Sequence, residues 1–194
     1  MAATNIEICS DAIVELGGKP ITDFSSTQLA IDAGRLYTLE RARLMRIHPW
    51  SFLRRQAILT VYATAPLFDW SYAFKLPISC IRVWRVGWLD RLVDCEIHSV
   101  NGSAELQVMC NIADNLPVVY SYDAGEAVWP AWFADLLGVH MQARLAYRVG
   151  NSRTLAADKK TEAEAMLRMY RGINGSEEPM RDLGGQSDAL AVRY

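Results

Sequence analysis

The feature that most constrains the fold of this chain is a change in hydrophobic period along its 194 residues. Apolar residues recur at helical intervals over 4–16 and 26–47, and again over 130–149 and 154–173. Over 54–122 the period shortens toward two and turn residues become frequent, which is typical of short antiparallel strands. The sequence therefore predicts an α+β fold in which two helix pairs flank an inserted β lobe.

Two capping-box spacings mark the starts of the first two helices. Thr4 precedes Glu7 by three residues, and Ser25 precedes Gln28 in the same way, so each hydroxyl can accept a hydrogen bond from the backbone. The second helix should end just before Pro49, because a residue that precedes proline disfavours helical conformation. Its apolar residues cover more than one face, which predicts packing on two sides, one of them against another subunit.

The middle of the chain predicts an antiparallel β-sandwich or a small barrel. The dipeptide Asn101–Gly102 is a strong hairpin signal and should join two strands. Pro77 should close the second strand, and Pro117 should precede the last one. The expected strands span 58–62, 70–76, 80–88, 94–100, 106–110 and 118–122.

These patterns divide the chain into three units. The helices of 1–53 and 123–174 should pack together as one discontinuous helical bundle, and 54–122 should form the inserted β lobe. The tail of 175–194 is polar, rich in glycine and without a period, so it should be an extended, flexible C-terminal arm that orders only on docking.

Charge and cysteine content argue against several classes of protein. Lys and Arg total 20 against 22 Asp and Glu, so the chain lacks the basic excess with which nucleic-acid-binding proteins neutralise phosphates. We recognise neither a signal peptide nor an apolar run long enough to cross a membrane. The four cysteines lack C-x-x-C spacing, and we expect reduced thiols, with a disulfide between two strand cysteines as the alternative. They are Cys9, Cys80, Cys95 and Cys110.

The residue patterns predict no catalytic, cofactor-binding or metal site. His48, His98 and His140 lie in different expected elements and lack the spacing of metal ligands. The sequence contains no signature of a nucleophile elbow, a P-loop or a dinucleotide-binding turn. The candidates for the carboxylate pair that a glycan hydrolase requires are Asp69, Asp94 and Glu96.

Arginine and aromatic side chains gather near the expected junction of helices and strands. We expect the arginines around Pro49 to form salt bridges with Glu40 and with neighbouring subunits. A phosphate-facing strip in a nucleic-acid-binding module is the alternative. The aromatic side chains should pack the core, with anchoring of an interface as the competing role. The arginines are Arg41, Arg43, Arg46, Arg54 and Arg55, and the aromatic residues include Trp50, Phe52, Trp129, Trp132 and Phe133.

Four segments, in order, carry a family resemblance that spans about residues 4–171. They are Asn5 to Gly17 with Pro20–Ile21; Arg41 to Leu44 with His48-Pro49-Trp50-Ser51-Phe52; Trp70 to Phe74 with Leu76–Pro77 and Cys80 to Val83; and Pro117 to Tyr122 with Trp129–Pro130 and Phe133. Together they resemble the tail tubular protein A family of short-tailed bacteriophages, the head-to-tail adaptor beneath the portal. The regions 84–115 and 175–194 do not contribute to the resemblance.

The resemblance implies a structural virion protein of the tail, assembled in the host cytoplasm, and not an enzyme. Copies of the chain, usually twelve, would form a ring that binds the portal protein and the tail nozzle protein. DNA would pass through the channel of that ring, and neither a membrane nor a cofactor would take part. The candidate subunit or portal interface comprises Leu36, Tyr37, Arg41 and Arg43 on the second helix, and Leu183, Leu190, Val192 and Tyr194 on the arm.

Three other functions remain open from the sequence. A head-completion or connector protein of a long-tailed phage would share a similar adaptor fold. A glycan hydrolase associated with the tail would need two converging carboxylates. A nucleic-acid-binding module would use the arginine strip and would show a steep salt dependence of its affinity.

Overall fold

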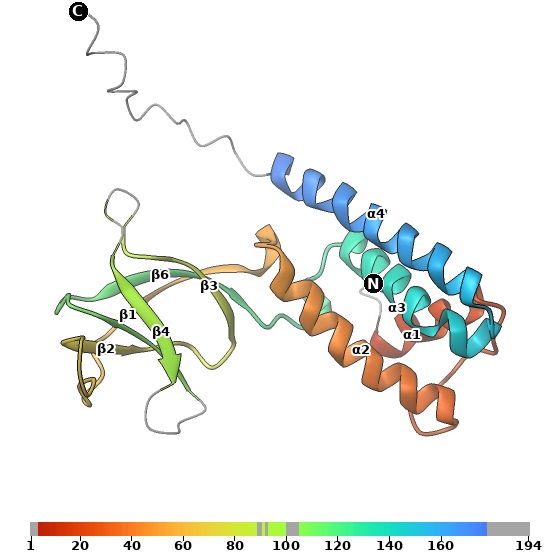
Figure 1. Cartoon of the computed structure of the whole chain (residues 1–194), viewed down its shortest axis with the longest axis horizontal. Helices are drawn as coiled ribbons and strands as arrows, with labels where there is room; N and C mark the ends of the chain where they lie inside the picture. The colour runs from red at the N-terminus through yellow and green to blue at the C-terminus, as the bar shows by residue number, and fades with distance from the viewer. Residues whose placement is uncertain (1–3, 89–90, 92, 100–104, 178–194) are drawn as a thin grey trace, which may run out of the picture.

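The computed structural model describes residues 4–88, 91, 93–99 and 105–177. Over these residues the fold is mixed α+β, with four α-helices and two antiparallel sheets of three strands each. Figure 1 shows the helices gathered on one side and the strands on the other, joined near the end of α2 (Gln28–Ile47). We call these regions the helical part and the strand part.

The third helix, α3 (Ala131–Gly150), occupies the centre of the helical part. It packs against α4 (Arg153–Glu177), against α1 (Asn5–Glu15) and against α2. In Figure 1, α4 and α2 lie on either side of α3. The helices share one apolar core, because the buried stripe of each faces the others. Its fully buried members include Cys9, Ile13, Leu44, Met45, Leu136, Leu137, Met141 and Leu145.

One of the two predicted capping boxes is confirmed and the other is wrong. At the start of α1, the Thr4 hydroxyl accepts from the Glu7 N–H, and the Glu7 carboxylate accepts from the Thr4 N–H. At the start of α2 the cap is Thr27, whose hydroxyl accepts from the Ala30 N–H at 3.1 Å. Ser25 instead donates to the Asp23 carboxylate, which holds it in the preceding turn.

The strands form two separate sheets. One has the order β1 (Arg54–Leu59), β6 (Leu116–Tyr122), β3 (Cys80–Val86), and the other has the order β2 (Tyr72–Lys75), β5 (Leu106–Cys110), β4 (Cys95–Ser99). Among the described residues the sheets do not close into a barrel, so the small-barrel expectation was wrong. A single bridge, between Val61 and Phe74, links the chain beyond β1 to β2, and the ladder does not continue from it.

Both sheets contribute side chains to a second apolar core. Phe74 and Val108 enter it from one sheet, and Leu116 and Val118 enter it from the other. All four are almost fully buried. The predicted return strand over 106–110 is confirmed, and β4 pairs with it as an antiparallel neighbour. The hairpin dipeptide Asn101–Gly102 itself lies outside the described residues.

Two strand boundaries differ from expectation for identifiable reasons. The first strand covers Arg54–Leu59 and not 58–62, because its whole length pairs with β6. Pro117 lies inside β6 and does not precede it. A proline has no N–H to donate, but the Pro117 carbonyl accepts from the Gly87 N–H at 2.9 Å, so its remaining backbone group is satisfied.

The last helix also extends further than predicted. α4 continues past Ile173 and Asn174 to Glu177, so 175–177 are helical where the sequence predicted an arm. Residues 178–194, including Leu183, Leu190, Val192 and Tyr194, lie outside the described residues.

Candidate functional site

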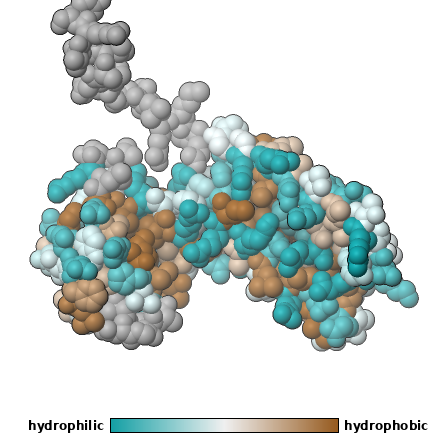
Figure 2. Space-filling model, in the orientation of Figure 1, coloured by the Kyte–Doolittle hydropathy of each residue, from teal (hydrophilic) through white to brown (hydrophobic). Residues whose placement is uncertain are grey.

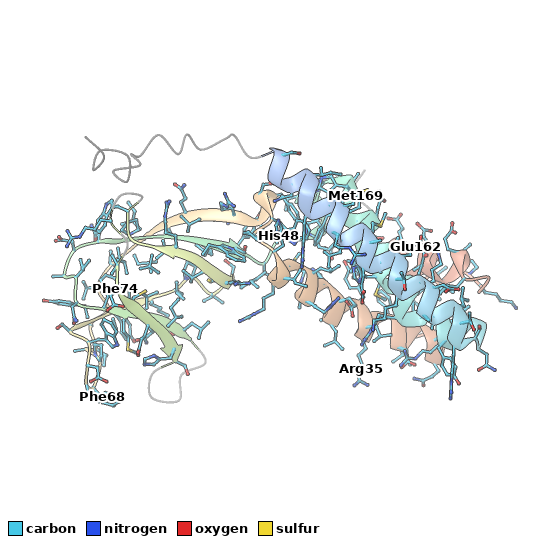
Figure 3. The ribbon with its side chains drawn as sticks, turned by 45° about the horizontal axis from the view of Figure 1, so that its top comes forward. Arg35, His48, Phe68, Phe74, Glu162 and Met169 are labelled. Atoms are coloured by element: carbon cyan, nitrogen blue, oxygen red, sulfur yellow. The ribbon has the colours of Figure 1, made fainter. Side chains whose placement is uncertain are left out.

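The helical part and the strand part meet where α2 ends at Ile47 and β1 begins at Arg54, and we call this region the joint. The indole of Trp50 lies at its centre. Its side chain is fully buried, and its Nε1–H donates to the Leu44 carbonyl at 2.7 Å. Its ring lies 5.4 Å from that of Trp132 and 5.7 Å from that of Phe133, centroid to centroid. The expected role of these aromatic residues in core packing is confirmed. Figure 3 shows the neighbouring His48 between the helical part and the strand part.

The arginine strip connects α2 to the segments that lead into and out of the strands. Arg41 donates to the Asp123 carboxylate at 2.6 Å and to the Ala124 carbonyl at 2.8 Å. Arg46 donates to the Ile81 carbonyl at 3.3 Å. The guanidinium of Arg55 lies over the Tyr122 ring at 3.5 Å from its centroid. The expected pairing with Glu40 is confirmed for Arg43 at 3.3 Å, but these other contacts go mainly to residues around the joint.

Two of the candidate interface residues on α2 belong to the core of the same chain. Leu36 and Tyr37 are only 7% and 5% exposed, so little of either side chain is accessible to a neighbour. The Tyr37 hydroxyl donates to Glu126 at 2.6 Å, and burial together with this bond raises the pKa of the phenol. The large apolar side chains that α2 does expose are Ile31, Leu39 and Ile47.

A groove of about 820 Å³ runs between α2 and α4, with α3 as its floor. Small side chains and charged side chains both line it. The small ones are Ala143, Ala156, Ala157 and Ala163. The charged ones are Glu40, Arg43, Arg144, Arg148, Lys160 and Glu164.

A buried carboxylate organises one end of the groove. Glu40 is 5% exposed, and it lies 3.3 Å from the Arg43 guanidinium of its own helix and 3.3 Å from that of Arg144 on α3. These two arginines compensate the burial of its charge, since a lone buried carboxylate is strongly disfavoured. Further along the groove, Arg148 pairs with Asp32 at 3.1 Å.

His140 is the buried titratable group of the groove. It is 5% exposed, and its Nε2 has no hydrogen-bond partner among the described residues. Burial lowers its pKa to about 4, with a further decrease from nearby Arg43 and an opposing increase from Glu164. At neutral pH the imidazole is uncharged and leaves a hydrogen-bonding atom unused.

The sequence reasoning did not identify the groove. His140, Arg144 and Arg148 are spaced by four residues, which is the signal of one polar face on a helix. The broad apolar stripe of α3 obscured that face. No sequence pattern places Glu40 of α2 opposite this face, because helix crossing is a tertiary property.

The strand part carries exposed apolar side chains of its own. Ile58 and Leu67 are exposed on β1 and on the loop that follows it, and Phe68 is 74% exposed in the same loop. Figure 3 places Phe68 at the end of the strand part that lies far from the helices. Figure 2 shows brown, hydrophobic areas on the strand part as well as on the mostly hydrophilic helical surface. The molecule thus presents apolar surface at two separated places.

Two of the three carboxylate candidates share a hollow in the strand part. Asp69 and Glu96 line a space of about 150 Å³ together with His98. Asp69 has a φ of 65°, a strained conformation for a residue other than glycine. Asp94 does not line this hollow.

Other chemistry has little support within the described residues. No group of three or more His, Cys, Asp or Glu side chains there is arranged to hold a metal ion. No helix in that part of the chain is both long and apolar enough to cross a membrane. All four cysteines are free thiols, so the disulfide alternative is wrong.

Comparison with known proteins adds no family assignment. No family model matches the chain, and no curated protein matches it.

Proposed function

We propose that the protein is a structural head-to-tail adaptor of a bacteriophage tail. In this proposal copies of the chain, twelve by the family resemblance, form a ring beneath the portal protein and extend the channel through which DNA passes. The helical part acts as a discontinuous bundle for subunit contacts, and the strand part acts as an inserted sandwich-like lobe that faces the tail nozzle protein. The location that follows is the tail of the virion, after assembly in the host cytoplasm.

One observation carries the proposal: two of the four segments that resemble the adaptor family meet in the joint. Arg41 and the Trp50 region from one segment contact Asp123, Ala124 and Phe133, which lie beside or within another. A joint held by charged hydrogen bonds and a buried aromatic cluster fixes the orientation of one part relative to the other. Fixed orientation is what a ring subunit requires, because its two ends must present surfaces at a repeatable angle.

The surfaces available for assembly are consistent with such a role. The groove beside α3 lies in the helical part, and the exposed apolar loop with Leu67 and Phe68 lies in the strand part. The neighbouring Leu67 and Phe68 side chains are 75% and 74% exposed, so they are accessible to another protein. The near balance of 20 basic and 22 acidic residues also suits a channel that must let DNA slide.

A direct test is the mass of the purified protein with and without the portal protein of the same phage, measured by light scattering. The proposal expects a complex with several copies of this chain for each portal ring, and a ring visible by electron microscopy. A chain that binds no portal at any ratio would refute it. A chain that assembles only on the portal would agree with it.

The glycan hydrolase remains a second candidate because Asp69, which has a positive φ, lines the same hollow as Glu96. It predicts cleavage of cell-envelope glycans by the purified protein, abolished in Asp69→Asn and Glu96→Gln. Absence of cleavage together with portal binding would leave the adaptor as the better proposal.

A further inference from the structure

We propose that the exposed acidic face of α1 from one copy of the chain docks into the groove between α2 and α4 of the next copy. The inference rests on the proposed ring and deepens it, since it names the two faces that meet. The contact is heterologous, meaning that two different surfaces pair, which is the kind of contact from which a closed ring is built.

The groove has the charge and shape to receive an acidic helix. Its lining contains four cationic side chains, Arg43, Arg144, Arg148 and Lys160, against the two carboxylates Glu40 and Glu164. Glu40 engages Arg43 and Arg144, and Asp32 beside the groove engages Arg148. Counted with Asp32, the four cations face three carboxylates, so the groove carries one net positive charge. The alanine side chains between the helices allow another backbone to approach closely.

His140 is an independent sign that the groove has an occupant. Its side chain lines the groove and is only 5% exposed. Its Nε2 lacks a hydrogen-bond partner among the described residues. A buried polar atom without a partner is costly, and native proteins rarely leave one unsatisfied. Because Nε2 exposes almost no surface, a polar side chain from an entering helix would supply the missing hydrogen bond only after the imidazole turns toward the groove.

The first helix has the complementary charge. Within Asn5–Glu15 there are three acidic residues, Glu7, Asp11 and Glu15, and no Lys or Arg. All three side chains are exposed, whereas Ile8, Cys9, Ala12 and Ile13 of the same helix face the core. Glu7 also caps its own helix, so Asp11 and Glu15 are the acids most available to a neighbour.

The two sets of charges have matching spacing. Asp11 and Glu15 are four residues apart on α1, and Arg144 and Arg148 are four residues apart on α3. Four residues of α-helix rise about 6 Å, so both pairs repeat at the same distance along their helices. A helix lying along the groove can therefore place one carboxylate near each guanidinium, where it would share Arg144 with Glu40 and Arg148 with Asp32.

The occupant must come from a second copy. The acidic residues of α1 point away from the core in which α1 contacts α3, and none of them lines the groove of its own chain. A chain thus carries both faces without being able to join them to each other. Each copy would give its acidic face to one neighbour and its groove to the other.

Two charge-reversed variants test the contact. The acid-face variant carries Asp11→Lys and Glu15→Lys, and the groove variant carries Arg148→Glu and Lys160→Glu. A control matched to the acid-face variant carries Asp94→Lys and Asp114→Lys, which make the same change of net charge on exposed residues of the strand part. Circular dichroism establishes that each variant folds. Should Arg148→Glu unfold the chain through repulsion from Asp32, Lys160→Glu alone serves as the groove variant.

Self-association of the full chain is measured by sedimentation at low ionic strength and up to millimolar concentration. We expect each reversed variant to self-associate about tenfold or more weakly than the native chain, and the control to be unchanged. In an equal mixture, alternation of the two variants pairs each lysine-bearing α1 with a glutamate-bearing groove and each native α1 with a native groove. The mixture should therefore self-associate more strongly than either variant alone, though less strongly than the native chain because Arg144 is retained, and high salt should weaken it.

Three results would overturn the inference. The first is a native chain that stays monomeric at millimolar concentration. The second is reversed variants that self-associate as strongly as the native chain. The third is a mixture that self-associates no more strongly than either variant alone. Failure of the proposed function is distinguishable. Portal binding with no effect of the reversals refutes this contact alone, whereas restored association in the mixture without portal binding refutes the adaptor alone.

Discussion

The side-chain oxygen of Asn174 accepts two hydrogen bonds from Ser51, one from its backbone N–H and one from its hydroxyl, both at 2.9 Å. The Asn174 amide nitrogen lies 3.2 Å from Nε2 of His48, so the same side chain engages the joint twice. Asn174 is 1% exposed, although it lies 123 residues from Ser51 in sequence. This contact fastens the last helix to the turn at which the strands begin.

Replacing Asn174 with Ala should destabilise the fold by about 1–3 kcal/mol, because partly buried donors on Ser51 and a ring nitrogen of His48 lose this hydrogen-bonding partner. Ser51→Ala is the matched control, since it removes only the hydroxyl bond and should cost less. Urea unfolding of both variants measures the difference. Equal costs for the two variants would contradict the shared role of the amide.

Trp50→Ala should cost about 3–5 kcal/mol, because it removes a fully buried indole from the aromatic cluster of the joint. Trp50→Phe keeps an aromatic ring but removes the donor to the Leu44 carbonyl, and should cost about 1–2 kcal/mol. Thermal unfolding followed by circular dichroism gives both values. A Phe variant as unstable as the Ala variant would show that ring packing matters little here.

His140 should make the stability of the isolated chain depend on pH. Its pKa is about 4 in the fold, below the ordinary 6.5, so the unfolded chain binds the extra proton between these two values. The stability is fully present above pH 6.5 and is lost as the pH falls toward 4, by up to about 3 kcal/mol. His140→Gln should remove this part of the slope in urea titrations at several pH values. An unchanged slope would assign it to other groups.

Tyr37→Phe should destabilise the joint by about 1–2 kcal/mol, since it removes the 2.6 Å bond to Glu126. Burial raises the pKa of Glu126, but the Tyr37 bond, its own backbone and Arg41 lower it further, and the net pKa is below its usual range. A lowered carboxyl pKa contributes stability that is present at neutral pH and is lost on acidification. The Phe variant should lose less stability between neutral and acidic pH, as measured by chemical unfolding.

The cysteines should react slowly with alkylating reagents in the folded chain. Burial raises the pKa of all four thiols, and that of Cys9 to about 12, so little thiolate forms at mildly alkaline pH. Mass spectrometry after brief iodoacetamide treatment should find Cys9 unmodified, with full modification in urea. Rapid labelling of Cys9 in the native chain would mean that α1 opens readily.

Much of the local structure could be predicted from hydrophobic period alone. The spacing of Ile6, Cys9 and Ile13 predicted the first helix, and the alternation of Leu106, Val108 and Cys110 predicted β5. The predicted boundaries of the strands were less accurate. The start of β1 and the position of Pro117 depend on pairing with strands distant in sequence, which no local pattern contains.

The candidate site was less accessible to sequence reasoning than the fold. The interface role of Leu36 and Tyr37 was inferred from a broad apolar arc on α2. The part of that arc that holds these two residues packs in the core of the same chain, and only the remainder faces solvent. The groove depends on how α2, α3 and α4 cross. Compensation of the buried Glu40 charge depends on Arg144, which lies on another helix. Crossing angles and such pairings follow from the packing of side chains across the whole core.

The sequence by itself determined where the chain is helical and where it alternates, because those periods follow from the geometry of a single element. It also placed the aromatic and arginine residues near Pro49 at the junction. Only the tertiary structure decided that Asn174 closes the joint, that Nε2 of His140 is buried without a partner within the described part of the chain, and that a charged groove opens beside it. These features arise where separate elements meet, and burial there sets the cost of each unpaired polar group.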